Sequence, residues 1–186
     1  RGEENLPRTV TIKAVPQAAS AASIFERRRI MIRVGILGCG KIAQVRHIPE
    51  YAANPDCELA AFYNPTRKRA EDMAAKYGGR VYDTPEELLA DPEIDAVSVC
   101  AANYAHAELA IKAMRAGKNV LCEKPMAITL EDCEAMVKAA KETGRTLMIA
   151  HNQRFAKAHV KAKALIDAGE IGRIITFRTT FGHGGP

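Results

Sequence analysis

A glycine-rich segment near position 40 has the residue types and spacing needed to bind a phosphate group. Gly38-Cys39-Gly40-Lys41-Ile42-Ala43 reads G-x-G-x-x-A and lies between a short β-branched run and a segment of helical period. In such a loop the first glycine permits a tight turn, the second lets the backbone approach a pyrophosphate, and Ala43 allows close helix–strand packing. A structural glycine turn is the alternative, but free amides at the start of a helix favour diphosphate binding. The predicted dinucleotide contacts in this loop are Gly38, Cys39, Gly40, Lys41 and Ile42.

The residues after the second apolar run bear on which dinucleotide would bind. An NAD-binding unit usually has Asp or Glu there, which accepts hydrogen bonds from the ribose 2′-hydroxyl. This chain has Asn64, followed by Pro65-Thr66-Arg67-Lys68-Arg69. Asn64 lacks the charge that would repel a 2′-phosphate, and Thr66 and Arg67 could donate hydrogen bonds to one. NAD and NADP are therefore both open, with a slight preference for NADP; equally, the basic run is the solvated first turn of a helix.

A lysine follows the fifth apolar run, in the segment Glu123-Lys124-Pro125. Ligands of open α/β sheets bind at the carboxyl ends of the strands, so this lysine is expected to point into the ligand crevice. An ammonium group there can polarise a carbonyl or relay a proton from a hydroxyl. Lys124 is our candidate catalytic residue, and the alternative is a surface lysine paired with Glu123.

Short apolar runs alternate with segments of helical period from Met31 onward, and these must position the candidate residues. The order predicts a doubly wound parallel sheet with helices on both faces. Expected strands span 32–37, 59–63, 81–82, 96–100, 119–121 and 146–150. Expected helices span 41–53, 67–77, a segment opened by Thr84-Pro85, a segment from Ala105 to Gly117, and one opened by Thr129 and stopped by Gly144. Pro49 is expected to bend or shorten the first helix.

The rhythm changes after Ala150, where a helix over 155–168 and an alternating strand over 173–181 are expected. A single strand cannot bury its faces alone. We therefore interpret 31–150 as a dinucleotide-binding domain and 151–186 as the truncated start of a C-terminal α/β domain. His183, among glycines, is expected in a turn. The first methionine is Met31, so we expect residues 1–30 to be a leader that is disordered or not native.

Composition excludes several classes of protein. Apolar residues make up 47% and charged residues 26%, which is a globular balance. The net charge of +5 is concentrated in residues 1–30, which hold six Lys or Arg and three Asp or Glu, so the remainder carries 21 against 19. That remainder is a poor nucleic-acid surface, and no apolar run is long enough for a membrane span. Five cysteines without a CxxC pair indicate reduced thiols in a cytoplasmic protein and no metal site.

Several of these motifs occur together in one known family. The run from Ala116 to Pro125, AGKNVLCEKP, closely resembles the "aGkhVlcEKP" signature of the glucose–fructose oxidoreductase/inositol dehydrogenase/rhizopine-catabolism family, Gfo/Idh/MocA. The resemblance extends nearly continuously from Met31 to Pro186, through the G-x-G-x-x-A loop, the Asn103 to His106 segment and Asn152-Gln153-Arg154-Phe155. It implies a Rossmann domain followed by a C-terminal α/β domain with a large open sheet.

The resemblance also implies roles for individual residues. Lys124 would sit beside the nicotinamide and the reacting oxygen, with Glu123 also at the cofactor, and Asn103 and His106 would lie near the nicotinamide ribose. Ala101-Ala102 replaces the Thr-Pro often seen before that asparagine, which puts the geometry of the loop in doubt. His151, Asn152 and Arg154 could contact cofactor or substrate, or satisfy buried backbone at the domain crossing.

The function that the resemblance implies is NAD(P)-dependent hydride transfer at a hydroxyl or carbonyl carbon, on a sugar or cyclitol, by a homo-oligomer when full-length. Two alternatives stay open: an NAD-dependent glycoside hydrolase of the same family, and a non-catalytic dinucleotide-binding protein. The intact Glu123-Lys124-Pro125 segment argues against the last, because a sensor would not need that lysine.

Overall fold

The computed structural model describes residues 31–180 and Gly182. Our expectations for residues 1–30 and for His183 lie outside this range. Within it, no helix is both long and apolar enough to cross a membrane.

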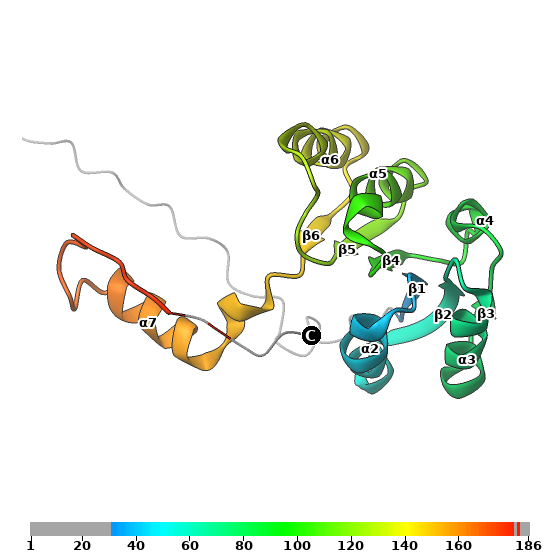
Figure 1. Cartoon of the computed structure of the whole chain (residues 1–186), viewed down its shortest axis with the longest axis horizontal. Coiled ribbons are helices and arrows are strands. Elements are labelled where there is room, and N and C mark those ends of the chain that lie inside the picture. The colour runs from blue at the N-terminus through cyan, green and yellow to red at the C-terminus, as the bar shows by residue number, and fades with distance from the viewer. Residues whose placement is uncertain (1–30, 181, 183–186) are drawn as a thin grey trace, which may run out of the picture. The chain divides into compact units, whose positions relative to one another are not determined.

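The core of the molecule is a six-stranded parallel sheet in the order β3-β2-β1-β4-β5-β6, which confirms the predicted doubly wound fold (Figure 1). The strands are β1 Ile32–Leu37, β2 Cys57–Tyr63, β3 Arg80–Val81, β4 Ala96–Val99, β5 Asn119–Cys122 and β6 Leu147–Ile149. The strand order reverses between β1 and β4. This switch point is where open α/β sheets bind ligands.

Helices cover both faces of the sheet, α2 and α3 on one and α4, α5 and α6 on the other (Figure 1). Their bounds, with those of the shorter helical turns, are η1 Ala43–His47, α2 Ile48–Ala53, α3 Arg67–Tyr77, α4 Pro85–Ala90, η2 Asn103–Ala105, α5 His106–Arg115, α6 Leu130–Thr143, η3 Asn152–Phe155 and α7 Lys157–Asp167. Each face has its own apolar cluster: Ile36 and Phe62 belong to one, and Val97 and Met114 to the other. The strands are buried between these clusters, as their apolar runs predict.

Side chains mark the helix boundaries where the sequence predicts them. Thr84 accepts a hydrogen bond from the Glu87 amide and Glu87 returns one to the Thr84 amide, a complete capping box. Thr129 caps α6 with its side chain, which accepts a hydrogen bond from the Asp132 amide. Gly144 ends α6 in the left-handed conformation, with φ of 64°. These boundaries are predictable because each one depends on contacts within a single turn of chain.

The helix after the glycine loop departs from the single helix predicted over 41–53. Residues 43–47 form a π-helical segment, in which the Ile48 amide donates to the Ala43 carbonyl, and α2 follows with Pro49 in its first turn. Proline lacks an amide hydrogen and is tolerated in a first turn, so the helical path continues past it. His47 ends the π segment as a buried residue, which the regular helical pattern did not indicate.

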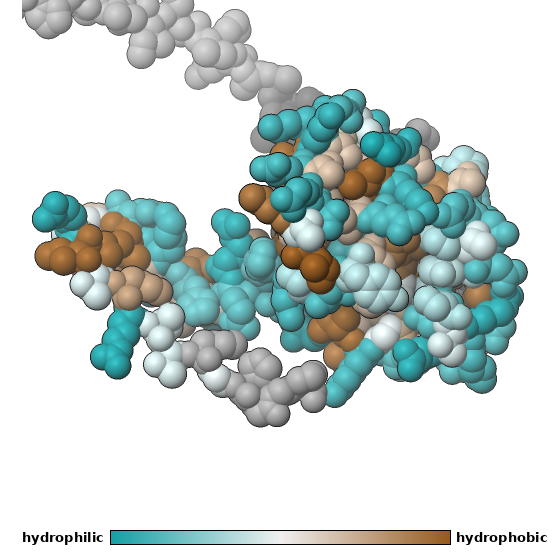
Figure 2. Space-filling view, turned by 45° about the horizontal axis from the view of Figure 1, so that its top comes forward, coloured by the Kyte–Doolittle hydropathy of each residue, from teal (hydrophilic) through white to brown (hydrophobic). Residues whose placement is uncertain are grey.

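The segment after β6 contrasts with the sheet domain. The helix predicted over 155–168 is present as α7, but it has no buried residue. The predicted strand over 173–181 is wrong: residues 173–180 contain no strand, and residue 181 lies outside the described range. An alternating pattern becomes a strand only when a neighbouring strand accepts its backbone hydrogen bonds. Ile175 and Phe177 are 86% and 80% exposed, and apolar surface is visible on this segment in Figure 2.

Candidate functional site

A crevice opens at the switch point, over the carboxyl ends of β1, β2 and β4, with a cavity of about 590 Å³. It brings together residues from three separate loops and from the helices α4 and α5. Those used below, which we call the cofactor crevice, are Gly38, Gly40, Lys41, Ile42, Asn64, Thr66, Arg69, Ala101, Tyr104, Glu86, Glu108 and Lys112. A crevice in this position, with helix-terminal amides at one end, suits a dinucleotide.

The two glycines of the loop differ in the physical reason for having glycine at that position. Gly38 has φ of 101°, and a Cβ built on it would lie 2.7 Å from the Ala101 backbone nitrogen, so only glycine fits there. A Cβ on Gly40 would meet nothing within 4 Å. The chain itself therefore does not require glycine at position 40. The open space over Gly40 is the cradle that a pyrophosphate would fill, so the loop fits the dinucleotide that its motif predicts.

Asn64 joins the glycine loop after β1 to the loop after β2. Its Oδ1 accepts a hydrogen bond from the Cys39 amide at 2.9 Å, and its Nδ2 donates to the Thr66 carbonyl at 3.0 Å. The residue is only 9% exposed, although it lines the crevice. Both of its polar atoms are engaged within the protein, so Asn64 acts on the crevice mainly by fixing these loops.

Cys39 is fully buried, so only its backbone can serve a ligand. Burial raises the pKa of its thiol to about 12, which keeps the thiol neutral. All five cysteines are free. In the part of the chain that the structure describes, no three His, Cys, Asp or Glu side chains are grouped to hold a metal ion.

The structure separates the three basic residues that follow Asn64. Arg67 donates to Glu71 at 2.9 Å and also pairs with Asp83, while Lys68 pairs with Asp72. Arg69 lines the crevice, and among residues 31–180 its side chain has no hydrogen bond or ion pair. Of these three residues Arg69 is the cation available to a ligand, and Arg67, which the sequence favoured, does not line the crevice.

A further cation on the rim of the crevice is already paired. Lys112 donates to Glu108 at 2.6 Å and to Glu86 at 2.7 Å. These hydrogen bonds raise the pKa of Lys112 above its ordinary value. Its charge is matched by two carboxylates, so among the described residues that line the crevice the cations without a partner are Arg69 and Lys41.

Lys124 is exposed at the end of β5 and is not among the residues that line the cofactor crevice, so its place in the ligand site stays a prediction. In the described part of the chain its ammonium group has no partner. The alternative pairing with Glu123 is not formed by the lysine side chain. Instead the Lys124 amide donates to Glu123 Oε2 at 2.9 Å. Glu123 Oε1 lies 2.8 Å from His47 Nε2, and both residues are buried.

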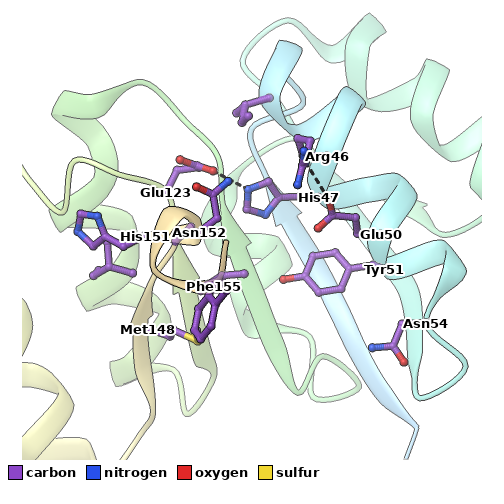
Figure 3. Close-up of a pocket in the computed structure, with 14 residues that line it drawn as sticks. Arg46, His47, Glu50, Tyr51, Asn54, Glu123, Met148, His151, Asn152 and Phe155 are labelled. Carbon is purple, nitrogen blue, oxygen red and sulfur yellow. Dashed lines mark hydrogen bonds and ion pairs between the residues drawn. The ribbon is translucent and has the colours of Figure 1, made fainter. Parts of the chain in front are cut away.

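His47 connects β4 with the end of β5 through its two ring nitrogens. Its Nδ1 lies 2.9 Å from Ser98 Oγ in β4, and its Nε2 faces the Glu123 carboxylate at the end of β5. Figure 3 shows the His47 ring and the Glu123 carboxylate pointing toward each other. They line a second cavity of about 310 Å³ with Ile42, His151, Asn152 and Phe155, whereas Arg154 does not line it.

His106 and Asn103 take different positions. Asn103 is exposed in η2, next to Tyr104, which is 82% exposed and lines the crevice. His106 is only 1% exposed and lines neither cavity. Its Nδ1 lies 2.7 Å from the Pro125 carbonyl oxygen and its Nε2 lies 3.1 Å from that of Ala101. A ribose contact from either residue stays a prediction, and the ring of His106 is taken up by backbone.

A crevice of this kind, at the switch point of a sheet in this order, is what the signature around Lys124 predicts. The model of an oxidoreductase family with an NAD-binding Rossmann fold, Gfo/Idh/MocA, matches residues 32–151. The chain belongs to this family.

Relatives and solved structures agree with this assignment. A 1,5-anhydro-D-fructose reductase from Ensifer adhaerens is 40% identical over 149 residues, which cover 80% of this chain and 44% of that protein. A myo-inositol 2-dehydrogenase from Thermotoga maritima is 33% identical over 150 residues, 80% of this chain and 45% of that protein. The crystal structure of KijD10, a 3-ketoreductase from Actinomadura kijaniata in complex with NADP, superposes with a TM-score of 0.69 at 35% identity. The superposition covers 76% of this chain and 45% of the KijD10 chain. The chain thus spans less than half the length of each of these relatives.

Sequence reasoning missed three residues of this Gfo/Idh/MocA domain. Arg69 was named only as part of a basic run, and Tyr104 and His47 were not singled out. A polar residue within the apolar run of β4, Ser98, is the one signal in the sequence that a buried partner such as His47 is needed. The other two have no such signal, because their position depends on how loops from different strands meet.

Proposed function

We propose that the protein to which this domain belongs is an NAD(P)-dependent oxidoreductase acting at a hydroxyl or carbonyl carbon of a sugar or cyclitol. The observation that carries the proposal is Lys124, a lysine with an unpaired ammonium group at the carboxyl end of β5, in a domain whose glycine loop leaves room for a pyrophosphate. The compounds named for the two relatives, an anhydro sugar and an inositol, support the substrate class.

The residues of the chain have separable tasks in this reaction. The backbone at Gly40, with the amides that follow it, binds the diphosphate. The Lys124 ammonium group polarises a carbonyl, or relays the proton that leaves a hydroxyl. A nicotinamide dinucleotide, when bound, accepts or supplies the hydride.

The proposal includes a preference for NADP. Arg69 is unpaired and lines the crevice near Thr66, whose hydroxyl can also donate. A guanidinium group suits a phosphate because it offers several donors in a fixed plane. The crystal structure of the related KijD10 with NADP is consistent with this choice.

The organisation of the whole protein is also part of the proposal. Every buried apolar residue in the described range lies between Val34 and Ala139, whereas α7 buries none, which supports a dinucleotide domain over 31–150 and the start of a second domain after it. Five free thiols support a reducing compartment such as the cytoplasm. Assembly into a homo-oligomer without nucleic acid or membrane stays a prediction, and light scattering of the full-length protein tests the assembly.

The test is an assay of the full-length protein for reduced cofactor against a panel of sugars and cyclitols, including 1,5-anhydro-D-fructose and myo-inositol. Wild-type protein should turn over at least one of them, and Lys124→Met should lower kcat by about 10²–10⁴-fold with cofactor affinity unchanged. Glycosidic cleavage without net reduction would indicate the glycoside hydrolase of the same family. Tight cofactor binding with neither activity would indicate a non-catalytic protein.

A further inference from the structure

Two buried histidines flank the peptide segment that carries Lys124. We propose that His47 and His106 are positioning residues for Lys124. They hold it through hydrogen bonds to the residues on either side, His47 to Glu123 and His106 to Pro125. The inference rests on the proposed function, since it assumes that Lys124 is catalytic. The hydrogen bonds of His47 and His106 are features of the fold and do not depend on that function.

The first contact, that of His47, acts through the Glu123 carboxylate. One oxygen, Oε1, faces His47 Nε2 at 2.8 Å, and the other, Oε2, accepts the Lys124 amide at 2.9 Å. A carboxylate engaged at both oxygens cannot rotate without losing one hydrogen bond, and an unmade hydrogen bond is unfavourable in a buried site. The orientation of the Lys124 backbone is thereby tied to the ring of His47.

The ring of His47 is itself held from the far side. Ser98 Oγ lies 2.9 Å from Nδ1, and Cys100 Sγ lies 3.5 Å from the same hydroxyl. With its hydrogen on Nε2, a neutral ring donates to Glu123 and accepts from Ser98, so every polar atom is satisfied. Ser98 is fully buried in β4 and out of reach of any substrate, so this Ser–His–Glu chain is a support and no nucleophilic triad.

The second contact, that of His106, lies on the other side of Lys124 in the sequence. His106 Nδ1 lies 2.7 Å from the Pro125 carbonyl oxygen, and Nε2 lies 3.1 Å from the Ala101 carbonyl oxygen. A neutral imidazole has a single N–H and can donate to one carbonyl only. We assign the donor to Nδ1, where the contact is shorter. With its hydrogen on Nδ1, His106 donates to the Pro125 carbonyl and leaves Nε2 without a hydrogen toward the Ala101 carbonyl oxygen, so it holds the lysine segment and not the Ala101 loop.

The two contacts use different ring nitrogens, Nε2 in His47 and Nδ1 in His106. Substitution by glutamine or asparagine should therefore affect the two positions differently. The amide nitrogen of glutamine can take the place of Nε2, and that of asparagine can take the place of Nδ1. His47→Gln should therefore keep the donor to Glu123, and His47→Asn should lose it. At the second site the pattern reverses: His106→Asn keeps the donor to Pro125 and His106→Gln loses it. A general packing role for either ring would not produce this crossed pattern.

The experiment measures these four variants in the full-length protein, together with His159→Gln, which alters an exposed histidine of α7. We expect His47→Gln and His106→Asn to retain kcat within about threefold. The opposite pair, His47→Asn and His106→Gln, should lose about 10–100-fold in kcat, the size of effect that a small misplacement of a catalytic group produces. Cofactor Kd should stay within about twofold in all of them, and the α7 control should match wild type.

A second readout does not depend on activity. The Lys124 amide hydrogen is bonded to Glu123, so its exchange with solvent should be faster in His47→Asn than in His47→Gln. Inactive wild-type protein would overturn the proposed function, and the exchange rates would then decide the positioning role on their own. Equal kcat and equal exchange rates for Gln and Asn at position 47 would overturn the role of His47, and equal kcat for the two variants at position 106 would overturn that of His106.

Discussion

The two ends of the proposed cofactor site, the cofactor crevice and the segment that carries Lys124, are built from different groups. The phosphate loop of the adenosine end and its support consist of glycines, backbone amides and the side-chain amide of Asn64, groups that carry no titratable proton. The lysine end consists of Lys124, a buried carboxylate and two buried histidines. The first end is arranged to bind through fixed dipoles, and the second to hold a group that carries a proton.

This difference has a physical reason. Binding a diphosphate requires only that amides point at it, and a backbone held by glycines and an asparagine does so at any pH where the fold is stable. Proton transfer requires a movable proton within a fixed geometry, which is why rigid rings support Lys124. The following variants test whether the two ends are as separable as this comparison implies.

The largest effects are expected at the two glycines. Gly40→Asp places a side chain and a charge in open space, so the fold should survive while cofactor affinity falls about 100-fold or more, measured by titration of NADPH fluorescence. Gly38→Ala should instead destabilise the protein by about 1–3 kcal/mol from its positive φ alone, seen in urea unfolding. Equal losses of stability in both variants would refute the distinction between them.

Asn64→Asp should come next. The carboxylate can still accept from the Cys39 amide, but it loses the hydrogen bond to the Thr66 carbonyl and faces that oxygen with like charge. We expect a loss of about 1–3 kcal/mol in stability and a preference shifted from NADP toward NAD. Unfolding curves and affinity ratios for both cofactors, compared with Asn64→Ser, separate the two effects. An unchanged ratio would mean that position 64 does not face the adenosine ribose.

The smallest and most selective effect is expected at the basic run. Arg69→Ala should weaken NADP by about tenfold and leave NAD nearly unchanged, because one charge-assisted contact contributes on the order of 1–3 kcal/mol. Arg67→Ala is the matched control: its partners are Glu71 and Asp83, so neither affinity should change. If Arg67→Ala, and not Arg69→Ala, reduces NADP binding, our assignment of the two arginines is reversed.

Much of this fold and part of its site could be read from local patterns. The strand Ile32–Leu37 and the helix Arg67–Tyr77 were predicted to the residue, because their signals lie in their own side chains. The capping box at Thr84 and the glycine at 144 are equally local. The positions of the glycine loop and Lys124 at strand ends were predictable as well, whereas their roles stay predictions. The strand over 173–181 failed because a strand needs a partner that the pattern does not supply.

What the sequence determined, then, was the order of the elements and the places where chemistry could occur. Only the tertiary structure decided which side chains serve it. His47 meets Glu123 across 76 positions, and Asn64 meets Cys39 across 25. Whether Arg67 or Arg69 is free depends on Asp83, which lies beyond β3. Such pairings arise when the sheet brings distant strand ends together, so no spacing within one segment could have shown them.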